Sequence, residues 1–208
     1  MPATLPDEMR RHFTGSRDAI RARLEAFGAV PQSLYFYELC YCLCTPQSSA
    51  RNAESAVQAL IEQNFFVTPF NPESLLRRGS SYIRFHKTKA KRLLRAREQF
   101  PEIEREILSH TTNLQKRDWL VENVDGMSLK EASHFLRNIG FRELAILDRH
   151  ILKHLMRCGV IRARPNTLTA KRYLSIERKF KRFAAAVDIP MDELDLLFWS
   201  AETGEILK

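Results

Sequence analysis

A chain of 208 residues is long enough to bury a sizeable core in one or two domains. Its formal net charge of +8 and pI of about 9.5 indicate an anionic partner, with nucleic acid ahead of an anionic membrane. No apolar run approaches the length of a bilayer span, and the N-terminal arginines precede no apolar signal-peptide core, so we expect a cytoplasmic protein that does not enter a membrane.

Sparse glycine and apolar positions that repeat every three or four residues predict an all-α protein with short connections. A first amphipathic helix is expected over 16–27. The segment 33–44 is apolar on all sides, which favours a buried helix, with a strand as the alternative because of its aromatic residues. The break at 45–49 begins the next helix, and a turn and another helix start follow at 70–76.

Three cysteines alternate at Cys40, Cys42 and Cys44, and Cys158 lies far along the chain. Such close spacing raises the possibility of a metal site. The segment is apolar, however, and no histidine cluster accompanies it, so we interpret the cysteines as buried thiols and predict no metal.

A basic helix is predicted over 82–97, and a helix with an acidic face over 102–108. A basic helix is usually a solvated face, but here it also offers a surface for phosphate groups. Its basic residues alternate with apolar ones and comprise Arg84, Lys87, Lys89, Lys91, Arg92, Arg95 and Arg97.

The pattern over 113–140 predicts helix, tight turn, helix. Gly126 supplies the turn, and Ser128 with Glu131 three residues later forms a capping box that begins the second helix. Gly140 ends that helix. Lys130 therefore lies in a first helical turn, where the positive end of the helix dipole favours the uncharged, nucleophilic amine.

Three further helices are expected after the hairpin. Asp148 is the N-cap of one, and Thr169 is the N-cap of a second basic helix. A final apolar helix covers 191–199.

Gly126-Met-Ser-Leu-Lys130, followed by Ile146-Leu-Asp148-Arg-His150, resembles the hairpin and downstream aspartate of the helix-hairpin-helix DNA glycosylase superfamily. The wider runs 130–140 and 144–152 resemble the archaeal-type 8-oxoguanine DNA glycosylase/lyases, and the resemblance extends over most of the chain. One departure is Ser128, which stands where the superfamily usually has a second hairpin glycine.

The resemblance implies two helical lobes with the active-site cleft between them. One lobe is a helical barrel over 50–148 that includes the hairpin at about 115–140. The other combines 1–49 with 149–208. Because no cysteine follows Cys158, the iron–sulfur cluster of some relatives in the superfamily is not expected.

The resemblance also implies a bifunctional glycosylase/AP lyase without metal or organic cofactor. Lys130 attacks C1′ of the sugar, expels 8-oxoguanine and forms a Schiff base, after which β-elimination nicks the strand. Asp148 stabilises the positive charge that develops on the sugar and helps to handle the proton of the incoming amine.

The partner is then double-stranded DNA that contains 8-oxoguanine, bound by a monomer at the nucleoid. Backbone amides at Gly126 and Ser128 hold phosphates, Arg84 adds charge, and Gln47 fills the gap left by the flipped base, unless it is an ordinary turn residue. Base recognition is assigned to the following residues: Trp199, the terminal Lys208 and Phe85.

Two alternatives remain open. A helix-hairpin-helix module that only binds DNA would need the hairpin and basic helices but neither Lys130 nor Asp148. A monofunctional glycosylase would use Asp148 with an activated water and would not need the lysine.

Overall fold

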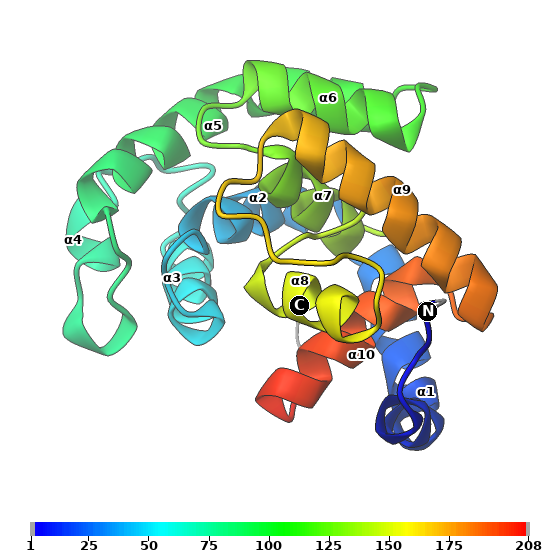
Figure 1. Ribbon diagram of the computed structural model, residues 1–208. Helices are drawn as coiled ribbons and strands as arrows, with labels where there is room; N and C mark the ends of the chain where they lie inside the picture. Colours follow the sequence, from blue (N-terminus) through cyan, green and yellow to red (C-terminus); the bar gives the residue numbers. More distant parts are fainter. Residues whose placement is uncertain (1–2, 207–208) are drawn as a thin grey trace. The chain divides into compact units, whose positions relative to one another are not determined.

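The computed structural model describes residues 3–206, and every regular element in that range is helical (Figure 1). No helix in this range combines the length and apolarity needed to cross a bilayer. The elements are α1 (Asp7–Gly28), η1 (Gln32–Leu34), α2 (Tyr35–Cys44), α3 (Ala50–Glu62), α4 (Glu73–Leu76), η2 (Gly79–Ser81), α5 (His86–Ile107), α6 (Asn113–Asn123), α7 (Leu129–Asn138), α8 (Arg149–Arg157), α9 (Ala170–Val187) and α10 (Met191–Thr203).

The expectation of two helices over 82–97 and 102–108 is wrong, because one helix, α5, runs from His86 through Pro101 to Ile107. Proline removes one helical hydrogen bond, which makes a helix break there a natural prediction. The buried face nevertheless continues at spacings of three and four on both sides of the proline, through Leu93, Ala96, Phe100, Ile103 and Ile107. Burial of that continuous face outweighs one lost hydrogen bond.

The first helix also starts earlier than its apolar pattern indicates, at Asp7 rather than at residue 16. Asp7 and Glu8 place negative charge in the first turn, where it stabilises the helix dipole. Met9 is buried, so tertiary packing orders this extra length although Gly15 lies within it.

Several predicted helix starts are confirmed by side-chain caps. The hydroxyl of Thr169 accepts from the backbone N–H of Arg172, and Asp148 caps α8. Ser49 likewise accepts from Asn52 and begins α3. The helical interpretation of 33–44 is confirmed too, because α2 occupies most of that segment.

The chain divides into two compact units, 30–135 and a discontinuous unit of 1–29 with 136–208, of which residues 3–29 and 136–206 are described. The boundaries therefore lie at about 30 and 135, where the resemblance implied 50 and 148. The first difference has a clear cause: α2 packs on α3 and α5, so the segment before residue 50 belongs to the 30–135 unit.

The 30–135 unit is built on α2, which is buried along most of its length. Phe36 packs its ring against Phe65, Phe66 and Phe100, with ring centroids 4.8–6.0 Å apart. All four cysteines of the chain are buried thiols outside any disulfide, as expected, and burial raises the pKa of Cys44 to about 12 and that of Cys158 to about 11. These thiols are packing residues.

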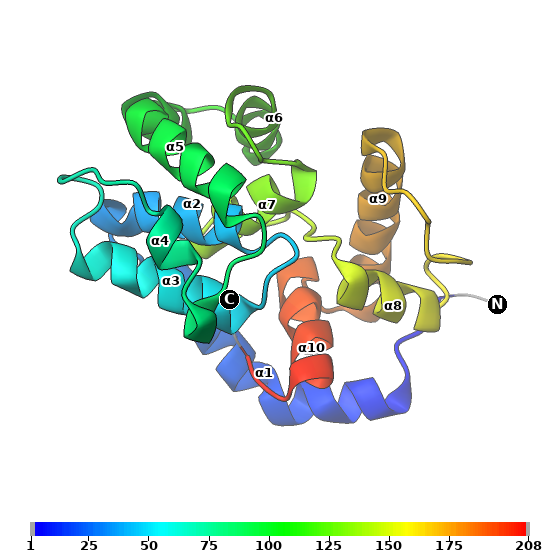
Figure 2. The ribbon, with the colours of Figure 1, turned by 90° about the vertical axis from the view of Figure 1, so that its left-hand side faces the viewer.

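In the discontinuous unit, α10 packs on α1, α8 and α9 (Figure 2). Nearly all of its side chains between Met191 and Ser200 are buried, including three carboxylates. A helix buried on this many sides must find partners for those charges. Asp192 accepts from the backbone N–H of Glu143, Glu193 from Arg21, and Asp195 from Arg137.

Candidate active site

The hairpin turn between α6 and α7 requires its glycine. The Met127 N–H donates to the carbonyl oxygen of Val124 at 3.1 Å, and Gly126 has φ +91°, as the third residue of a type II turn requires. A Cβ atom at Gly126 would lie 2.7 Å from the side chain of Arg92, which comes from α5. The turn is thus shaped by backbone conformation and by close packing.

Arg92 and Arg95 of α5 both form ion pairs with Asp125 in this turn, at 3.4 and 3.6 Å. Two cations therefore lie beside the hairpin amides. This is a suitable environment for a phosphate group, because helix N-termini and guanidinium groups both attract anions.

Ser128 begins α7 as the sequence predicts. Its hydroxyl accepts from the N–H of Lys130 at 3.3 Å, and the Glu131 carboxylate reaches back to the Ser128 N–H at 3.3 Å. Although burial raises the pKa of Glu131, the Lys130 ammonium and the Ser128 hydroxyl together hold it below its usual value.

Lys130 lies partly buried at the start of α7, with Nζ 2.9 Å from Glu131 Oε1. The same carboxylate that completes the cap therefore also binds the amine. This ion pair gives the amine a defined position.

Asp148 caps α8 with one oxygen. Its Oδ1 accepts from the backbone N–H groups of His150 and Ile151, both at 2.8 Å. The second carboxylate oxygen has no part in these two bonds, so capping fixes the orientation of the group without using both oxygens. The side chain is half-buried.

Asp148 acts electrostatically on Asp195 of α10. Burial raises the pKa of Asp195 to about 7, the charge of Arg137 at 3.1 Å lowers it, and Asp148 raises it further. Arg137 also stacks over the ring of Phe27 at 4.7 Å. Asp148 thus shares its surroundings with a second, buried carboxyl group.

Trp199 is half-buried on α10, and its ring forms a T-shaped contact with the ring of His150, with ring centroids 6.4 Å apart. Glu202, one turn further along α10, contacts three basic side chains of α8: His150, Lys153 and His154. These contacts hold the end of α10 against α8, so Asp148 and Trp199 belong to one packed substructure.

Gln47, Arg84 and Phe85 are exposed, and the structure brings their two segments together. The Arg84 N–H donates to the hydroxyl of Ser48 at 3.0 Å, and Asn52 donates to the carbonyl of Tyr82 at 2.9 Å. The Arg84 guanidinium lies over the Phe85 ring at 4.9 Å. The segments that carry Gln47, Arg84 and Phe85 thus lie side by side in the 30–135 unit.

The remaining predicted residue, Lys208, lies outside the described residues. Between residues 3 and 206, no group of three histidine, cysteine, aspartate or glutamate side chains is arranged to hold a metal ion.

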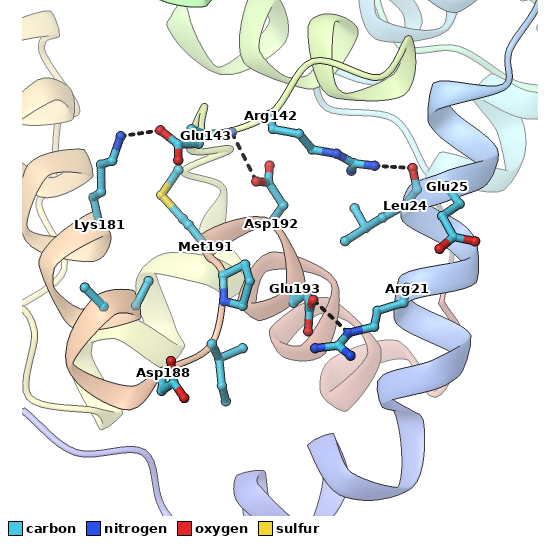
Figure 3. A pocket seen from close by; sticks show the side chains of 14 residues that line it. Arg21, Leu24, Glu25, Arg142, Glu143, Lys181, Asp188, Met191, Asp192 and Glu193 are labelled. Atoms are coloured by element: carbon cyan, nitrogen blue, oxygen red, sulfur yellow. Dashed lines mark hydrogen bonds and ion pairs between the residues drawn. The ribbon is translucent and has the colours of Figure 1, made fainter.

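A groove of about 740 Å³ opens in the discontinuous unit, between α1, the loop after α7, α9 and the start of α10 (Figure 3). Several polar groups that line it are paired: Arg21 donates to Glu193 at 3.0 Å, and the backbone N–H of Glu143 donates to Asp192 at 3.1 Å. None of the predicted site residues that the structure describes lines it. We therefore do not assign this groove to the base.

Sequence reasoning missed Lys89. It was grouped with the basic face of its helix, but its side chain is almost fully buried, at 2% exposed. Lys89 lies four residues before Leu93, which places it on the apolar face of α5. This helical spacing is the sequence signal that could have indicated its burial.

An all-α fold in which a hairpin presents a lysine at a helix start, and a separate aspartate caps another helix, defines the class of helix-hairpin-helix DNA glycosylases. The family described as 8-oxoguanine DNA glycosylase matches residues 20–189. This chain belongs to that family.

Individual relatives and solved structures agree with this family membership. An 8-oxoguanine DNA glycosylase/AP lyase of Fusobacterium nucleatum is 44% identical over 82% of this chain and 81% of its own length, and one of Korarchaeum cryptofilum is 34% identical over 97% and 96%. The crystal structure of the Methanocaldococcus jannaschii 8-oxoguanine glycosylase/lyase with 15mer DNA containing 8-oxoguanine matches with a TM-score of 0.86 and 31% identity, covering 97% of this chain and 98% of that one. The Thermotoga maritima 8-oxoguanine DNA glycosylase matches with a TM-score of 0.85 and 28% identity, covering 97% of each chain.

Proposed function

We propose that this protein excises 8-oxoguanine from double-stranded DNA and then nicks the strand at the resulting abasic site. The observation that carries the proposal is Lys130, held by Glu131 in the first turn of the second hairpin helix, in a chain that belongs to the 8-oxoguanine glycosylase family. The names of the relatives combine the same two activities, glycosylase and AP lyase.

In the first step, the Lys130 amine attacks C1′ of the damaged nucleotide. The amine must be uncharged to attack. Asp148 helps to handle its proton, and Glu131, whose carboxylate contacts Nζ at 2.9 Å, fixes the position of the amine. The bond from C1′ to the base breaks, the base leaves with its bonding electron pair, and a proton from the surroundings neutralises it. The sugar ring opens, and lysine and C1′ form a Schiff base.

Asp148 acts while the glycosidic bond breaks. Positive charge develops on the sugar, and an ionised carboxylate of fixed orientation lowers the energy of that state. In the second step, loss of a proton from C2′ of the Schiff base drives departure of the 3′ phosphate by β-elimination. Hydrolysis of the remaining Schiff base frees Lys130.

DNA binding is assigned to the hairpin and the basic helices. Amides at Gly126 and Ser128 would hold phosphate oxygens, and Arg84 adds positive charge. Gln47 would occupy the space that the flipped nucleotide leaves. The protein would bind as a monomer.

For base recognition, we assign Trp199 and Phe85 as the aromatic surfaces that stack on the purine, together with the terminal Lys208. 8-Oxoguanine differs from guanine by an N7–H donor, so an acceptor placed at N7 would stay unpaired with guanine. An unpaired buried polar group costs about 1–3 kcal/mol, which is enough to discriminate between the bases.

The test is borohydride trapping with duplex DNA that contains 8-oxoguanine, which reduces the Schiff base to a stable enzyme–DNA adduct. The wild type should give an adduct and a nicked strand, and Lys130→Gln should give neither while its duplex affinity is retained. Lys153→Gln, which changes another partly exposed lysine, is the control and should still be trapped.

Each alternative gives a different result. An adduct from Lys130→Gln at the wild-type yield would mean that another amine is the nucleophile. Base release without any adduct would indicate a monofunctional glycosylase. Duplex binding without base release would indicate a module that only binds DNA.

A further inference from the structure

Lys89 donates to three acceptors from one loop. Its Nζ lies 2.7 Å from the carbonyl oxygen of Cys44, 2.6 Å from that of Pro46 and 3.3 Å from the hydroxyl of Ser48. The ammonium thus holds the end of α2 and the turn that follows it. Two of these acceptors flank Gln47 directly in sequence.

Two segments that Lys89 contacts each contain one residue with a strained backbone. Gln47 has φ +56° and Phe85 has φ +60°, in the left-handed region that side chains with a Cβ rarely adopt. Phe85 precedes the first residue of α5, and its carbonyl accepts from the backbone N–H of Lys89 at 2.9 Å. Lys89 is therefore bonded to Phe85 through its backbone and to the neighbours of Gln47 through its side chain.

Ser48 links the loop that contains Gln47 to the segment that contains Arg84 and Phe85. Its hydroxyl accepts from the Lys89 ammonium and also from the backbone N–H of Arg84. Removal of the ammonium would leave two loop carbonyls without a donor and would loosen the residue to which the Phe85 segment is attached. The exposed side chains of Gln47 and Phe85 depend on the same buried group.

This loop lies near the start of α7. Burial lowers the pKa of Lys89 to about 8, and among the charges that act on it Glu131 raises that value while Lys130 lowers it. The Lys89 ammonium is therefore within electrostatic reach of the proposed nucleophile and its partner carboxylate.

We infer that Lys89 is a positioning residue for base extrusion, because its buried ammonium fixes the strained backbone at Gln47 and Phe85. Gln47 is thereby held in position to fill the gap that the flipped nucleotide leaves in the duplex, and Phe85 is held in position to contact the flipped base. The inference rests on the proposed function, and it assigns Lys89 no contact with DNA. It predicts that loss of Lys89 impairs steps that require flipping far more than the lyase step at a site that has already lost its base.

The first test compares Lys89→Met on two matched duplexes in single-turnover experiments. Excision of 8-oxoguanine should slow by about tenfold or more, the scale expected when a distant residue mispositions reacting groups. Nicking of a preformed abasic site should change by less than about threefold, because no base then has to be held. If Lys89→Met does not fold, Lys89→Gln, whose amide retains N–H donors, takes its place.

Lys116 is the matched control in the same unit. It is also buried, at 3% exposed, and it donates to the backbone carbonyls of Glu106 and Ser109, at 3.2 and 2.6 Å. Lys116→Met removes the same kind of cap from another loop, so it should lower stability and leave the ratio of excision to abasic nicking unchanged. A similar change of that ratio in both variants would overturn the inference.

A second readout follows extrusion directly. With 2-aminopurine beside the lesion, its fluorescence should rise as the wild type unstacks the site, and the rise should be much smaller with Lys89→Met. In a Gln47→Ala background, Lys89→Met should slow excision by a smaller factor than it does alone, because both changes act on the positioning of the same side chain.

The outcomes separate the two proposals. If the wild type releases no 8-oxoguanine, the proposed function fails. If the wild type is active but Lys89→Met slows both substrates equally, or its effect is fully additive with Gln47→Ala, the proposed function stands and the role of Lys89 is wrong.

Discussion

Asp148 combines two tasks, a helix cap and a charged group at the proposed site. Asn is as good a cap as Asp but carries no charge. Asp148→Asn should therefore leave the free energy of unfolding nearly unchanged and slow single-turnover excision severely. The comparison is made with rate measurements and urea unfolding on the same protein preparations.

Asp148→Ala serves as its control, because it removes cap and charge together. It should slow excision as much as Asp148→Asn does and also lower stability by about 1 kcal/mol, the usual value of an N-cap. If Asp148→Asn excised the base at the wild-type rate, the electrostatic role would be excluded and only the cap would remain.

Asp195 makes the stability of the protein depend on pH. Burial raises its pKa in the fold to about 7, whereas an unfolded chain restores a value of about 3.9. The folded state therefore holds this proton more tightly, so the contribution to stability is complete below pH 4 and is lost as pH rises through about 7.

The measurement is the free energy of unfolding at several pH values for the wild type and for Asp195→Asn. The variant retains an acceptor for Arg137 but cannot titrate, so the loss of stability between pH 4 and 8 should be smaller than in the wild type. Parallel curves for the two proteins would contradict the raised pKa.

At the scale of elements, two glycines in the discontinuous unit differ in whether their positions can accommodate a Cβ atom. Gly140 follows the end of α7 with φ +95°, and a Cβ there would lie 2.8 Å from the Cα of Gly28, a backbone atom that has little freedom to move. Gly15 lies inside α1, and a Cβ there would have no neighbour within 4 Å.

Gly140→Ala should therefore destabilise the protein by about 2 kcal/mol or more, since left-handed backbone alone costs a residue with a Cβ about 1–2 kcal/mol. Gly15→Ala should stabilise it by about 0.5–1 kcal/mol, as expected in a helix interior. Urea unfolding of both variants measures the difference. A neutral or stabilising shift for Gly140→Ala would show that the close approach at Gly140 is not a constraint.

At the scale of the whole molecule, the charge of +8 predicts a binding constant that falls steeply with salt. Each phosphate neutralised contributes about −0.9 to the slope of log K against log salt. Replacing Arg178 and Arg182, both exposed on α9, with glutamine should make the slope shallower by about 1–2 if these residues contact DNA.

The control removes two charges elsewhere. Replacing Arg10 and Arg17 of α1 with glutamine lowers the net charge equally, but we assign no phosphate contact to these residues. The slope should then change much less. An equal change in both double variants would mean that the α9 arginines act only through net charge.

Much of this protein could be predicted from the sequence, because the start of a helix is determined by a few neighbouring residues. A cap such as Ser128 or Asp148 bonds with backbone groups two or three residues away, so short patterns predict it. The hairpin, the helical class and the buried cysteines followed from such patterns. The family followed from the resemblance of the segments that contain Lys130 and Asp148, and the comparisons confirm it.

Tertiary structure decided what depends on long-range burial. It carries α5 through Pro101, begins α1 at Asp7 and places segment 30–49 with α3 and α5. It also turns Lys89, which looks like one more surface lysine, into a buried donor to residues more than 40 positions earlier. A local pattern indicates which residues share one face of a helix. Only the tertiary structure determines which segments cover that face and which of their backbone groups need a hydrogen-bond donor.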